Sequence, residues 1–441
     1  MKVSRQMFAG AMALALVASA CGGDDETVTQ ESTETPASSE TESEASETES
    51  ESEGSESESE GGGAAAGTKA DPELETVRIG WLNQDEGVPS FPGSTKGADV
   101  AVEYINNELG GIDGHAIELV KCSPGLDEAS NQACAQEMAN DEGVQVVSSG
   151  FLIGSPPIYP VLAAAGKPIL GGSPLNISDF TQPGAYFYSP GTPGIIGGMP
   201  EFVLNHLEGD KPSKAAIVHS DNDAGRAALP LIKPELEAAG IEVTVVAVPD
   251  DATDLVGPIT AAGAADADVF FPLVSQATCI QVANALQTLG VEVTVVTTQL
   301  CADSAVRAAA NEGIQGWYVG GNGPSALQGK GIDDDLDTYI EAFETYGDPE
   351  DTSLGGATGG FANIMILQKL GTEIGVDNLT ADAWSEALSS YTGAMFLGAP
   401  MITCPGPVLP NLCTTQYKMT QVSGDGFEAA GPDFIDSVEN N

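Results

Sequence analysis

Two short loops of the chain combine glycines with a serine, and such loops can hold a negatively charged group. The first is Gly150-Phe151-Leu152-Ile153-Gly154-Ser155, and the second is Gly171-Gly172-Ser173. Glycines with a serine before a helix start suit an anion, because unpaired backbone amides and the helix dipole point outward. The serines also suit plain N-caps, so both interpretations remain open. The candidate ligand contacts in these loops are Gly154, Ser155, Gly172 and Ser173.

Residues for catalysis or metal binding are sparse. The chain has three histidines, no CxxC pair and no GxSxG, HExxH or P-loop pattern. An enzyme needs a nucleophile with a base in reach, or a metal with an open coordination position. His219 is the one histidine that ends an expected strand. We therefore predict a protein that is not an enzyme, binds no cofactor and has no zinc site.

The elements that must position these loops are strands and helices that alternate after residue 76. Strands separated by helices of about 10–15 residues predict βαβ units and parallel sheets. Two such sets predict an α/β protein with two doubly wound parallel-sheet lobes, in which ligands bind at the carboxyl ends of the strands. The expected strands are Val77–Leu82, Ile117–Lys121, Val144–Ser148, Pro168–Leu170, Ala215–His219, Val243–Val248, Val269–Leu273 and Val293–Thr297.

The first 20 residues have the features of an export signal. Lys2 and Arg5 precede an apolar run from Met7 to Val17, and small residues stand before Cys21. An apolar run of about 11 residues is too short for a membrane-spanning helix, which needs about 20. Small residues directly before a cysteine resemble a bacterial lipobox, so we predict a signal peptide over residues 1–20 and lipidation of Cys21. Ordinary cleavage, with Cys21 left as a free thiol, is the alternative.

Residues 21–76 are interpreted as the lipidated cysteine and a disordered, acidic linker. From Asp24 to Gly67 the chain is almost entirely Ser, Glu, Thr, Gly and Ala. Such a composition cannot bury enough apolar surface to offset the entropy of ordering. We expect this linker to tether the folded part to the outer side of a bacterial cell membrane.

The chain is strongly acidic, with 65 acidic and 15 basic side chains and a formal net charge of −50. The stretch from Asp24 to Glu60 holds 15 of the acids and no base, so the part that follows Glu60 retains 50 acidic and 13 basic residues. Such a surface repels phosphate backbones, which excludes nucleic acid as a partner. A folded domain of this charge also repels itself at low salt, and we hypothesise that it works in a saline medium.

Seven cysteines become six once Cys21 is assigned to a lipid. An exported protein lies in an oxidising compartment, where disulfides are the default. Six cysteines can pair in many ways. Their spacing along the chain favours three local pairs, Cys122–Cys134, Cys279–Cys301 and Cys404–Cys413.

Several segments of the folded part match one known pattern. The strand Ile79-Gly80-Trp81-Leu82-Asn83-Gln84 is followed by an alanine-containing helix that ends in Ile105-Asn106 and by the turn Leu109-Gly110-Gly111-Ile112-Asp113-Gly114. Ala165-Gly166-Lys167-Pro168-Ile169 is a weaker match. From about Val77 to Gly426 the chain resembles type I periplasmic binding proteins of the leucine/isoleucine/valine-binding class, which are substrate-binding lipoproteins of ABC transporters.

This resemblance implies two α/β lobes joined by a three-strand hinge. The lobes close on a small solute, which an ABC permease with a cytoplasmic ATPase then takes up. By analogy, lobe 1 comprises residues 77–192 and 322–396, and lobe 2 comprises residues 193–321 and 397–441. The hairpin closed by Cys404 and Cys413 is expected to pack in lobe 2. The resemblance also implies that the two glycine–serine loops hold the ligand carboxylate.

Lobe 2 departs from the pattern of an amino-acid binder. The acid that meets a ligand ammonium in such proteins corresponds to Gln299, which has no charge to offset a buried cation. Ala224 and the pair Ser275-Gln276 stand where aromatic residues are common. We therefore expect a more polar, amide-rich cleft. Candidates for the missing carboxylate, each of which also suits a solvated surface, are Asp85, Glu86, Asp223 and Asp303.

Three further residues near strand ends are candidates for the cleft. Phe91 and Trp81 could give apolar cover on the lobe 1 side, although Trp81 also suits the core. Arg226 follows a strand-end loop and either pairs with a ligand anion or faces solvent. The predicted ligand contacts are Phe91, Gly154, Ser155, Gly172, Ser173, Asp223, Ser275, Gln276 and Gln299.

We hypothesise that the protein is the extracytoplasmic, lipid-anchored solute-binding component of an ABC importer. Its solute would be small and polar, such as an amino acid or an amide. The alternative is a binding protein that reports ligand occupancy to a membrane signalling receptor. The predicted lipid anchor, without a transmembrane helix or cytoplasmic domain in the sequence, favours transport.

Overall fold

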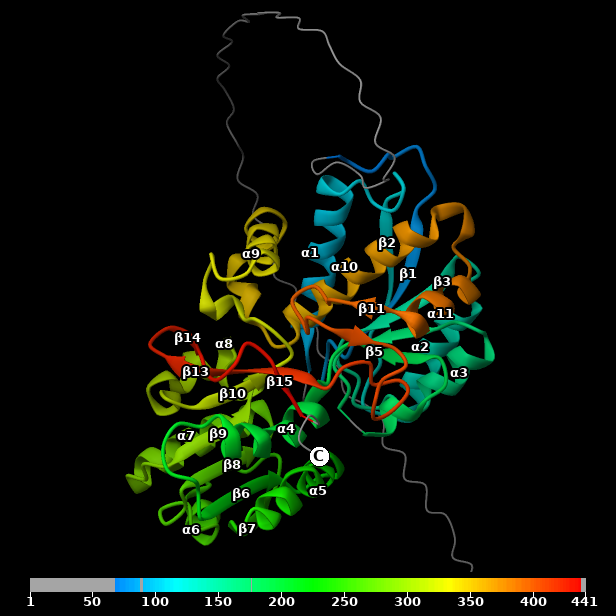
Figure 1. Ribbon diagram of the computed structural model, residues 1–441. Helices are drawn as coiled ribbons and strands as arrows, with labels where there is room; N and C mark the ends of the chain where they lie inside the picture. Colours follow the sequence, from blue (N-terminus) through cyan, green and yellow to red (C-terminus); the bar gives the residue numbers. More distant parts are fainter. Residues whose placement is uncertain (1–67, 88–89, 176, 438–441) are drawn as a thin grey trace, which may run out of the picture. The chain divides into compact units, whose positions relative to one another are not determined.

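The computed structural model describes residues 68–87, 90–175 and 177–437, all within one unit of the chain that begins near Gly62. The predicted signal peptide, Cys21 and most of the linker lie outside these residues. Figure 1 shows that the described strands form two main sheets, each flanked by helices. We call the elements packed on the first sheet lobe 1 and those packed on the second lobe 2.

Lobe 1 is built on a five-stranded parallel sheet with the spatial order β2-β1-β3-β4-β5. In β1, which has a neighbouring strand on each side, Ile79, Trp81 and Leu82 are wholly buried. Burial of consecutive residues is typical of a parallel sheet that is covered on both faces. The strands are β1 (Val77–Leu82), β2 (Ile117–Cys122), β3 (Val144–Ser149), β4 (Ile169–Gly171) and β5 (Ala185–Phe187).

Helices cover both faces of this sheet. One core contains Ile79, Trp81 and Val146 and packs against α1, α9, α10 and α11, while Leu82 and Val147 pack against α2 and α3. The Trp81 indole N–H donates to Thr95 Oγ1 at 2.9 Å, so Trp81 belongs to the core. The helices are α1 (Pro92–Glu108), α2 (Glu128–Asn140), α3 (Ile158–Ala164), α9 (Asp334–Tyr346), α10 (Ala357–Ile374) and α11 (Ala381–Ser390).

Lobe 2 is built on an eight-stranded sheet whose main path runs β14-β13-β10-β9-β8-β6-β7, with β15 paired to β13. The five strands β6, β7, β8, β9 and β10 pair in parallel, as predicted. Strand β13 pairs antiparallel with β10, and β14 and β15 each pair antiparallel with β13. The strands are β6 (Lys214–Ser220), β7 (Glu242–Val248), β8 (Val269–Leu273), β9 (Thr294–Thr298), β10 (Tyr318–Gly321), β13 (Gln416–Ser423), β14 (Gly426–Ala429) and β15 (Ile435–Asp436).

The helices of lobe 2 also lie on both faces of its sheet. Buried residues of α4 and α5 pack with Ile217 and Phe271, and those of α6, α7 and α8 pack with Val218 and Phe270. The predicted doubly wound α/β class is therefore confirmed. The helices are α4 (Gly191–Asn205), α5 (Asp223–Ala238), α6 (Val256–Ala261), α7 (Gln276–Leu289) and α8 (Ser304–Ala310).

The chain passes between the two lobes three times. Tyr188 belongs to the lobe 1 core and Ile195 to a lobe 2 core, so the first crossing lies between them. The second crossing lies between residues 319 and 336, and the third between residues 413 and 417. These crossings correspond to the hinge that the sequence predicts.

The hairpin closed by Cys404 and Cys413 packs in lobe 1, so the prediction that it packs in lobe 2 is wrong. Both cysteines and Ile402, in the short strand β12 (Ile402–Thr403), belong to the lobe 1 core. Phe187 N–H donates to Asn411 O at 2.9 Å, and Cys413 N–H donates to Phe187 O at 2.9 Å. The segment therefore satisfies the backbone groups of the edge strand β5, which would otherwise be unpaired.

The three predicted disulfides are all present. Cys122–Cys134 joins the end of β2 to α2, Cys279–Cys301 joins α7 to the loop after β9, and Cys404–Cys413 closes the hairpin. Among the described residues, no helix is both long and apolar enough to cross a membrane.

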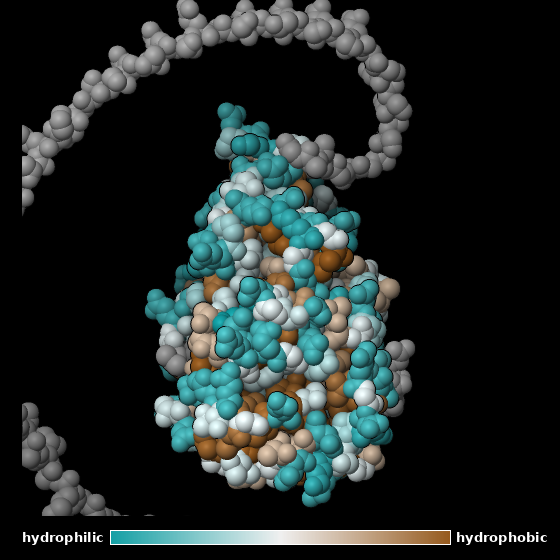
Figure 2. Space-filling view, turned by 90° about the vertical axis from the view of Figure 1, so that its left-hand side faces the viewer, coloured by the Kyte–Doolittle hydropathy of each residue, from teal (hydrophilic) through white to brown (hydrophobic). Residues whose placement is uncertain are grey.

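Hydrophilic side chains cover most of the face shown in Figure 2, and hydrophobic ones are visible mainly in recesses between them. Few large apolar side chains of the described residues are exposed. They are Leu74, Leu126, Ile332, Met401 and Val408.

Candidate functional site

A cavity of about 110 Å³ lies between the two lobes. Lobe 1 contributes the loop after β4 and the start of α10, and lobe 2 contributes the loop after β9. The crossing segments add Ser189, Asn322, Gly323 and Ser325. The strand-end loops of both sheets thus meet at one site, as expected for open α/β sheets. Polar residues in the lining include Ser94, Ser173, Thr298, Gln299, Asp303 and Asn322.

Three of the predicted ligand contacts line this cavity. They are Gly172 and Ser173 after β4, and Gln299 after β9. The backbone amides of the first two are engaged within the chain, because Gly172 N–H donates to Ser149 Oγ at 3.2 Å and Ser173 N–H to Gly150 O at 3.4 Å. The loop therefore faces the cavity but does not offer the free amides that the sequence suggested for an anion.

Gly154 and Ser155 are not among the lining residues. The Ser155 hydroxyl donates to Asp179 Oδ1 at 2.6 Å in a buried position. Gly154 packs so closely on Asn131 that a Cβ at this glycine would lie 2.5 Å from Asn131 Nδ2. Both residues thus hold the loop after β3 against its own lobe.

Phe91 lies one layer behind the cavity wall. Its ring stacks on Phe151, with 4.5 Å between the ring centroids, and it is Phe151 that lines the cavity. The predicted apolar cover on the lobe 1 side is therefore supplied by Phe151, with Phe91 as its support.

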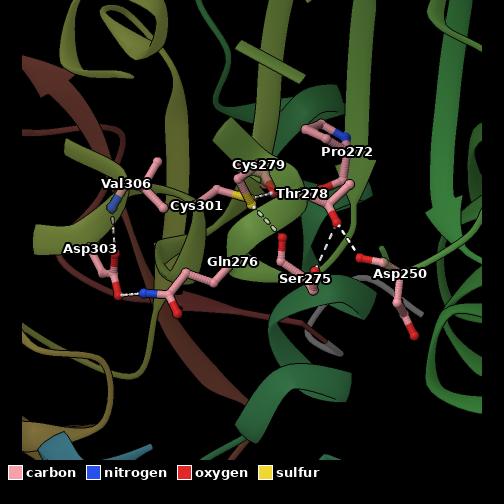
Figure 3. Close-up of a disulfide and its surroundings, with 10 residues drawn as sticks. Asp250, Pro272, Ser275, Gln276, Thr278, Cys279, Cys301, Asp303 and Val306 are labelled. Atoms are coloured by element: carbon pink, nitrogen blue, oxygen red, sulfur yellow. Dashed lines mark hydrogen bonds between the residues drawn. A yellow bond between two sulfur atoms is a disulfide. The ribbon is translucent and has the colours of Figure 1, made fainter. Parts of the chain in front are cut away.

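Two predicted contacts at the start of α7 form hydrogen bonds within lobe 2. Ser275 Oγ pairs with Thr278 Oγ1 at 2.9 Å, and the Gln276 side-chain amide donates to the carboxylate of Asp303 (Figure 3). Neither residue lines the cavity, although Asp303 does. Asp223 begins α5, and its side chain is outside the described part of the structure.

Among the candidate acids with described side chains, Asp303 is the one that lines the cavity. It is the N-cap of α8, where its Oδ1 accepts from Val306 N–H at 3.0 Å, and its side chain is buried. Burial raises the pKa of Asp303 to about 6, although the hydrogen bonds from Val306 and Gln276 act in the opposite direction. A buried carboxyl with a shifted pKa in a cavity is typical of a functional site.

The other charged candidates whose side chains the structure describes lie away from the cavity lining. Asp85 accepts from Asn83 Nδ2 at 2.7 Å, and Glu86 is exposed. Arg226 forms an exposed ion pair with Asp221 at 2.6 Å, which fits its solvent-facing interpretation. His219 is buried, with Nδ1 2.8 Å from Ser220 O, as a structural histidine would be.

The lobe 2 wall of the cavity is held in place by a disulfide (Figure 3). Gln299, Leu300 and Ala302 belong to the 3-10 turn Gln299–Ala302, which Cys301 ties to Cys279 of α7. Thr297, near the end of β9, donates to Pro272 O at 2.7 Å. The turn and Asp303 are thus fixed to α7 and to the neighbouring strand.

Sequence reasoning missed most of the lobe 1 wall. Most of this side of the cavity is lined by Ser94 of α1, by residues 352–356 before α10 and by residues 358–360 in its first turn. The glycine-rich run Gly355-Gly356-Ala357-Thr358-Gly359-Gly360 before an apolar helix was the signal that could have revealed it. No cluster of His, Cys, Asp or Glu in the described residues could hold a metal ion.

Comparisons with known proteins agree with this architecture. An ABC transporter substrate-binding protein from Sphaerobacter thermophilus has a TM-score of 0.69 at 17% identity, over 82% of this chain and 98% of that one. A solute-binding protein from R. palustris in complex with 4-hydroxybenzoate has a TM-score of 0.67 at 16% identity, over 82% and 97%.

A third structure is the branched-chain amino acid transporter substrate-binding protein of Streptococcus pneumoniae in complex with isoleucine. It has a TM-score of 0.66 at 14% identity, over 82% of this chain and 99% of that one. A search of curated proteins finds no significant match. The family model described as periplasmic binding protein matches residues 76–423. This match covers most of the chain and, together with the two-lobed fold and the cavity between the lobes, it shows that the protein belongs to the periplasmic binding protein family.

Proposed function

We propose that this protein is the solute-binding component of an ABC importer and captures one small polar solute between its lobes. The observation that carries the proposal is the interlobe cavity, whose walls hold polar groups without partners in the described chain. One of them is Asn322 Oδ1, a buried acceptor on the second crossing. Buried polar groups are normally paired, so those that line a cavity indicate a polar ligand.

The size of the cavity limits the solute. A water molecule needs about 10–15 Å³ measured in this way, so 110 Å³ corresponds to roughly seven to eleven waters. A solute of about ten non-hydrogen atoms replaces them. The isoleucine and 4-hydroxybenzoate bound to the structures above are of this order of size.

The charge of the lining favours a solute with a donor group. Asp303 is an acid in the lining, and no Lys, Arg or His of the described residues lines the cavity. An ammonium or amide N–H of the solute would therefore meet Asp303, with Gln299 beside it in the same loop. In amino-acid binders of the family that this chain resembles, the acid that meets the ligand ammonium stands at the position of Gln299. Here Asp303 would take that role.

The proposed place of work is the outer side of a membrane. Membership of this family places the protein outside the cytoplasm, and structures with the same fold are ABC transporter substrate-binding proteins. We propose that a lipid on Cys21 holds the protein at the membrane, beside the permease and its ATPase.

Native mass spectrometry of the protein purified from its own growth medium tests this function, followed by thermal-shift titration of amino acids, amides and benzoates. A small polar solute that is retained, or that stabilises the protein, is the expected result. If no solute is retained and none stabilises the protein, the proposed function is wrong. If leucine, isoleucine or valine alone stabilise it, the argument for a polar cleft fails.

A further inference from the structure

Ser94 is a buried hydroxyl that faces the cavity without a partner. It is 1% exposed and lines the cavity, and none of the described residues forms a hydrogen bond with its Oγ. A polar group that faces a cavity without a protein partner is free to bind a molecule that enters the cavity, so this hydroxyl is a candidate contact for the solute.

The N-terminus of α10 supplies further free donors beside Ser94. The helix is 18 residues long, and its N-cap Gly356 has no side chain with which to cap it. Ala357 N–H donates to Leu354 O at 3.1 Å and Gly360 N–H to Gly356 O at 2.9 Å. The amides of Thr358 and Gly359 have no partner among the described residues, and both residues line the cavity.

Close packing of α1 on α10 brings these donors together. A Cβ on Gly356 would lie 2.2 Å from Ser94 Oγ, and one on Gly360 would lie 1.9 Å from Ser94 O. The Ser94 hydroxyl thus lies where an N-cap side chain would be, but it does not form the capping hydrogen bond. Hydroxyl, amides and helix dipole all favour an acceptor that carries negative charge.

We propose that Ser94 and the Thr358 and Gly359 amides form the subsite for an acceptor oxygen of the solute, such as a carboxylate. This inference rests on the proposed function and specifies where the solute binds. It moves the acceptor subsite away from Gly172 and Ser173, whose amides are already engaged. Because α1 and α10 share one core, the subsite lies wholly in lobe 1.

The same end of the cavity also faces an acid. Asp303 Oδ2 lies 3.7 Å from the position of a Cβ on Gly355, the residue before the N-cap of α10. A carboxylate alone would meet this acid and be repelled. The subsite therefore takes a solute in which a donor or cationic group stands next to the acceptor.

The test compares Ser94→Ala with Ser390→Ala, a control in α11 of the same lobe whose Oγ donates to Glu386 O. The probes are the proteinogenic L-amino acids, and for the tightest binder also the amine that lacks its carboxylate. We expect Ser94→Ala to weaken binding of the amino acid about tenfold, because hydrogen bonds to charged groups are the stronger ones. Binding of the amine should be equal in all three proteins.

Each other outcome overturns the inference in a distinguishable way. Equal affinity of Ser94→Ala and wild type for the amino acid overturns the subsite but leaves the proposed function standing. If Ser94→Ala weakens binding of the amino acid and of the amine equally, Ser94 supports the fold of the site and does not bind the acceptor oxygen. If wild type binds none of the amino acids and retains no solute, both the proposed function and this subsite are wrong.

Discussion

The side-chain amide of Gln276 donates a hydrogen bond to the carboxylate of Asp303, and the two residues come from separate elements of lobe 2. Gln276 begins α7, and Asp303 caps α8 beside the cavity. The loop between β9 and α8 is thus fixed by this hydrogen bond as well as by the Cys279–Cys301 disulfide. The acid is held in place before any solute arrives, which lowers the cost of ordering it on binding.

The raised pKa of Asp303 predicts an unusual dependence of stability on pH. Its pKa is about 6 in the folded protein, above the ordinary value of 3.8. Between these values the unfolded chain loses the proton that the folded chain keeps, so stability falls as pH rises from 4 to 6. Asp303→Asn should therefore stabilise the unliganded protein at neutral pH, by at most about 3 kcal/mol, and have little effect near pH 4.

Urea denaturation at several pH values measures this effect, with Asp268→Asn as a control of opposite sign. Hydrogen bonds from Ser213 and Lys214 lower the pKa of Asp268, so its removal should destabilise the protein at neutral pH. If a solute cation meets Asp303, solute affinity should also fall below pH 6, and Asp303→Asn should abolish that dependence. If Asp303→Asn and wild type have the same stability at every pH, the raised pKa of Asp303 is wrong.

The disulfides provide a matched pair of cross-links for testing how the lobe 2 wall is positioned. Cys279–Cys301 and Cys122–Cys134 close loops with sequence separations of 22 and 12. Replacing either pair by alanine should cost about 3 kcal/mol of stability, because the unfolded chain gains similar freedom. Of the two disulfides, Cys279–Cys301 anchors Gln299 and Asp303, so only the loss of Cys279–Cys301 should also weaken solute binding. Calorimetric titration at a temperature where both variants are folded measures the difference, and equal affinities would refute the positioning role.

Much of the fold could be predicted because its signals are local. The strands Val77–Leu82 and Val269–Leu273 have the bounds that the sequence indicated, since short runs rich in β-branched residues stand out clearly there. The place of the Cys404–Cys413 hairpin could not be predicted in this way. It depends on backbone hydrogen bonds to Phe187, more than 200 residues earlier in the chain.

The site was predictable only where it follows directly from a strand end. Ser173, Gln299 and Asp303 lie in or beside strand-end loops, which the alternation of strands and helices locates. Ser94 and Thr358 are far apart in the sequence, and their proximity results from the packing of α1 on α10. That packing uses glycines, since a Cβ on Gly97 would lie 2.0 Å from Ala357 O. No local pattern reveals such a contact.

Gly355 provides a test of lobe closure. A Cβ at this lobe 1 residue would lie 3.4 Å from Leu300 Cδ2 of lobe 2, an ordinary contact across the cavity. Gly355→Ala should therefore be tolerated, whereas the extra methyl groups of Gly355→Val would hold the lobes apart. We expect Gly355→Val to weaken solute binding about tenfold, because overpacking costs about 1–3 kcal/mol. Unliganded stability should change less, since separated lobes relieve the clash.

Small-angle X-ray scattering with and without solute reports this closure directly. Gly355→Val should show a smaller solute-induced decrease in the radius of gyration than Gly355→Ala. If both variants bind and close like wild type, Gly355 does not limit the approach of the lobes.

The acidic surface has two opposing responses to salt. Ion pairs such as Lys96–Asp351 and Arg78–Asp141, each 2.7 Å long, weaken when salt screens them. Such surface pairs contribute little to stability, however. With 50 acids against 13 bases beyond Glu60, repulsion among the carboxylates in excess outweighs the loss of these pairs. Salt should therefore stabilise the folded protein.

Screening of this repulsion should raise the urea midpoint as sodium chloride increases, most steeply at low salt where the Debye length is longest. Potassium chloride should act equally if screening is the cause, and sucrose at matched osmolality is the control for exclusion from the surface. A midpoint that falls as salt rises would show that the ion pairs outweigh the repulsion, and it would remove the argument for a saline environment.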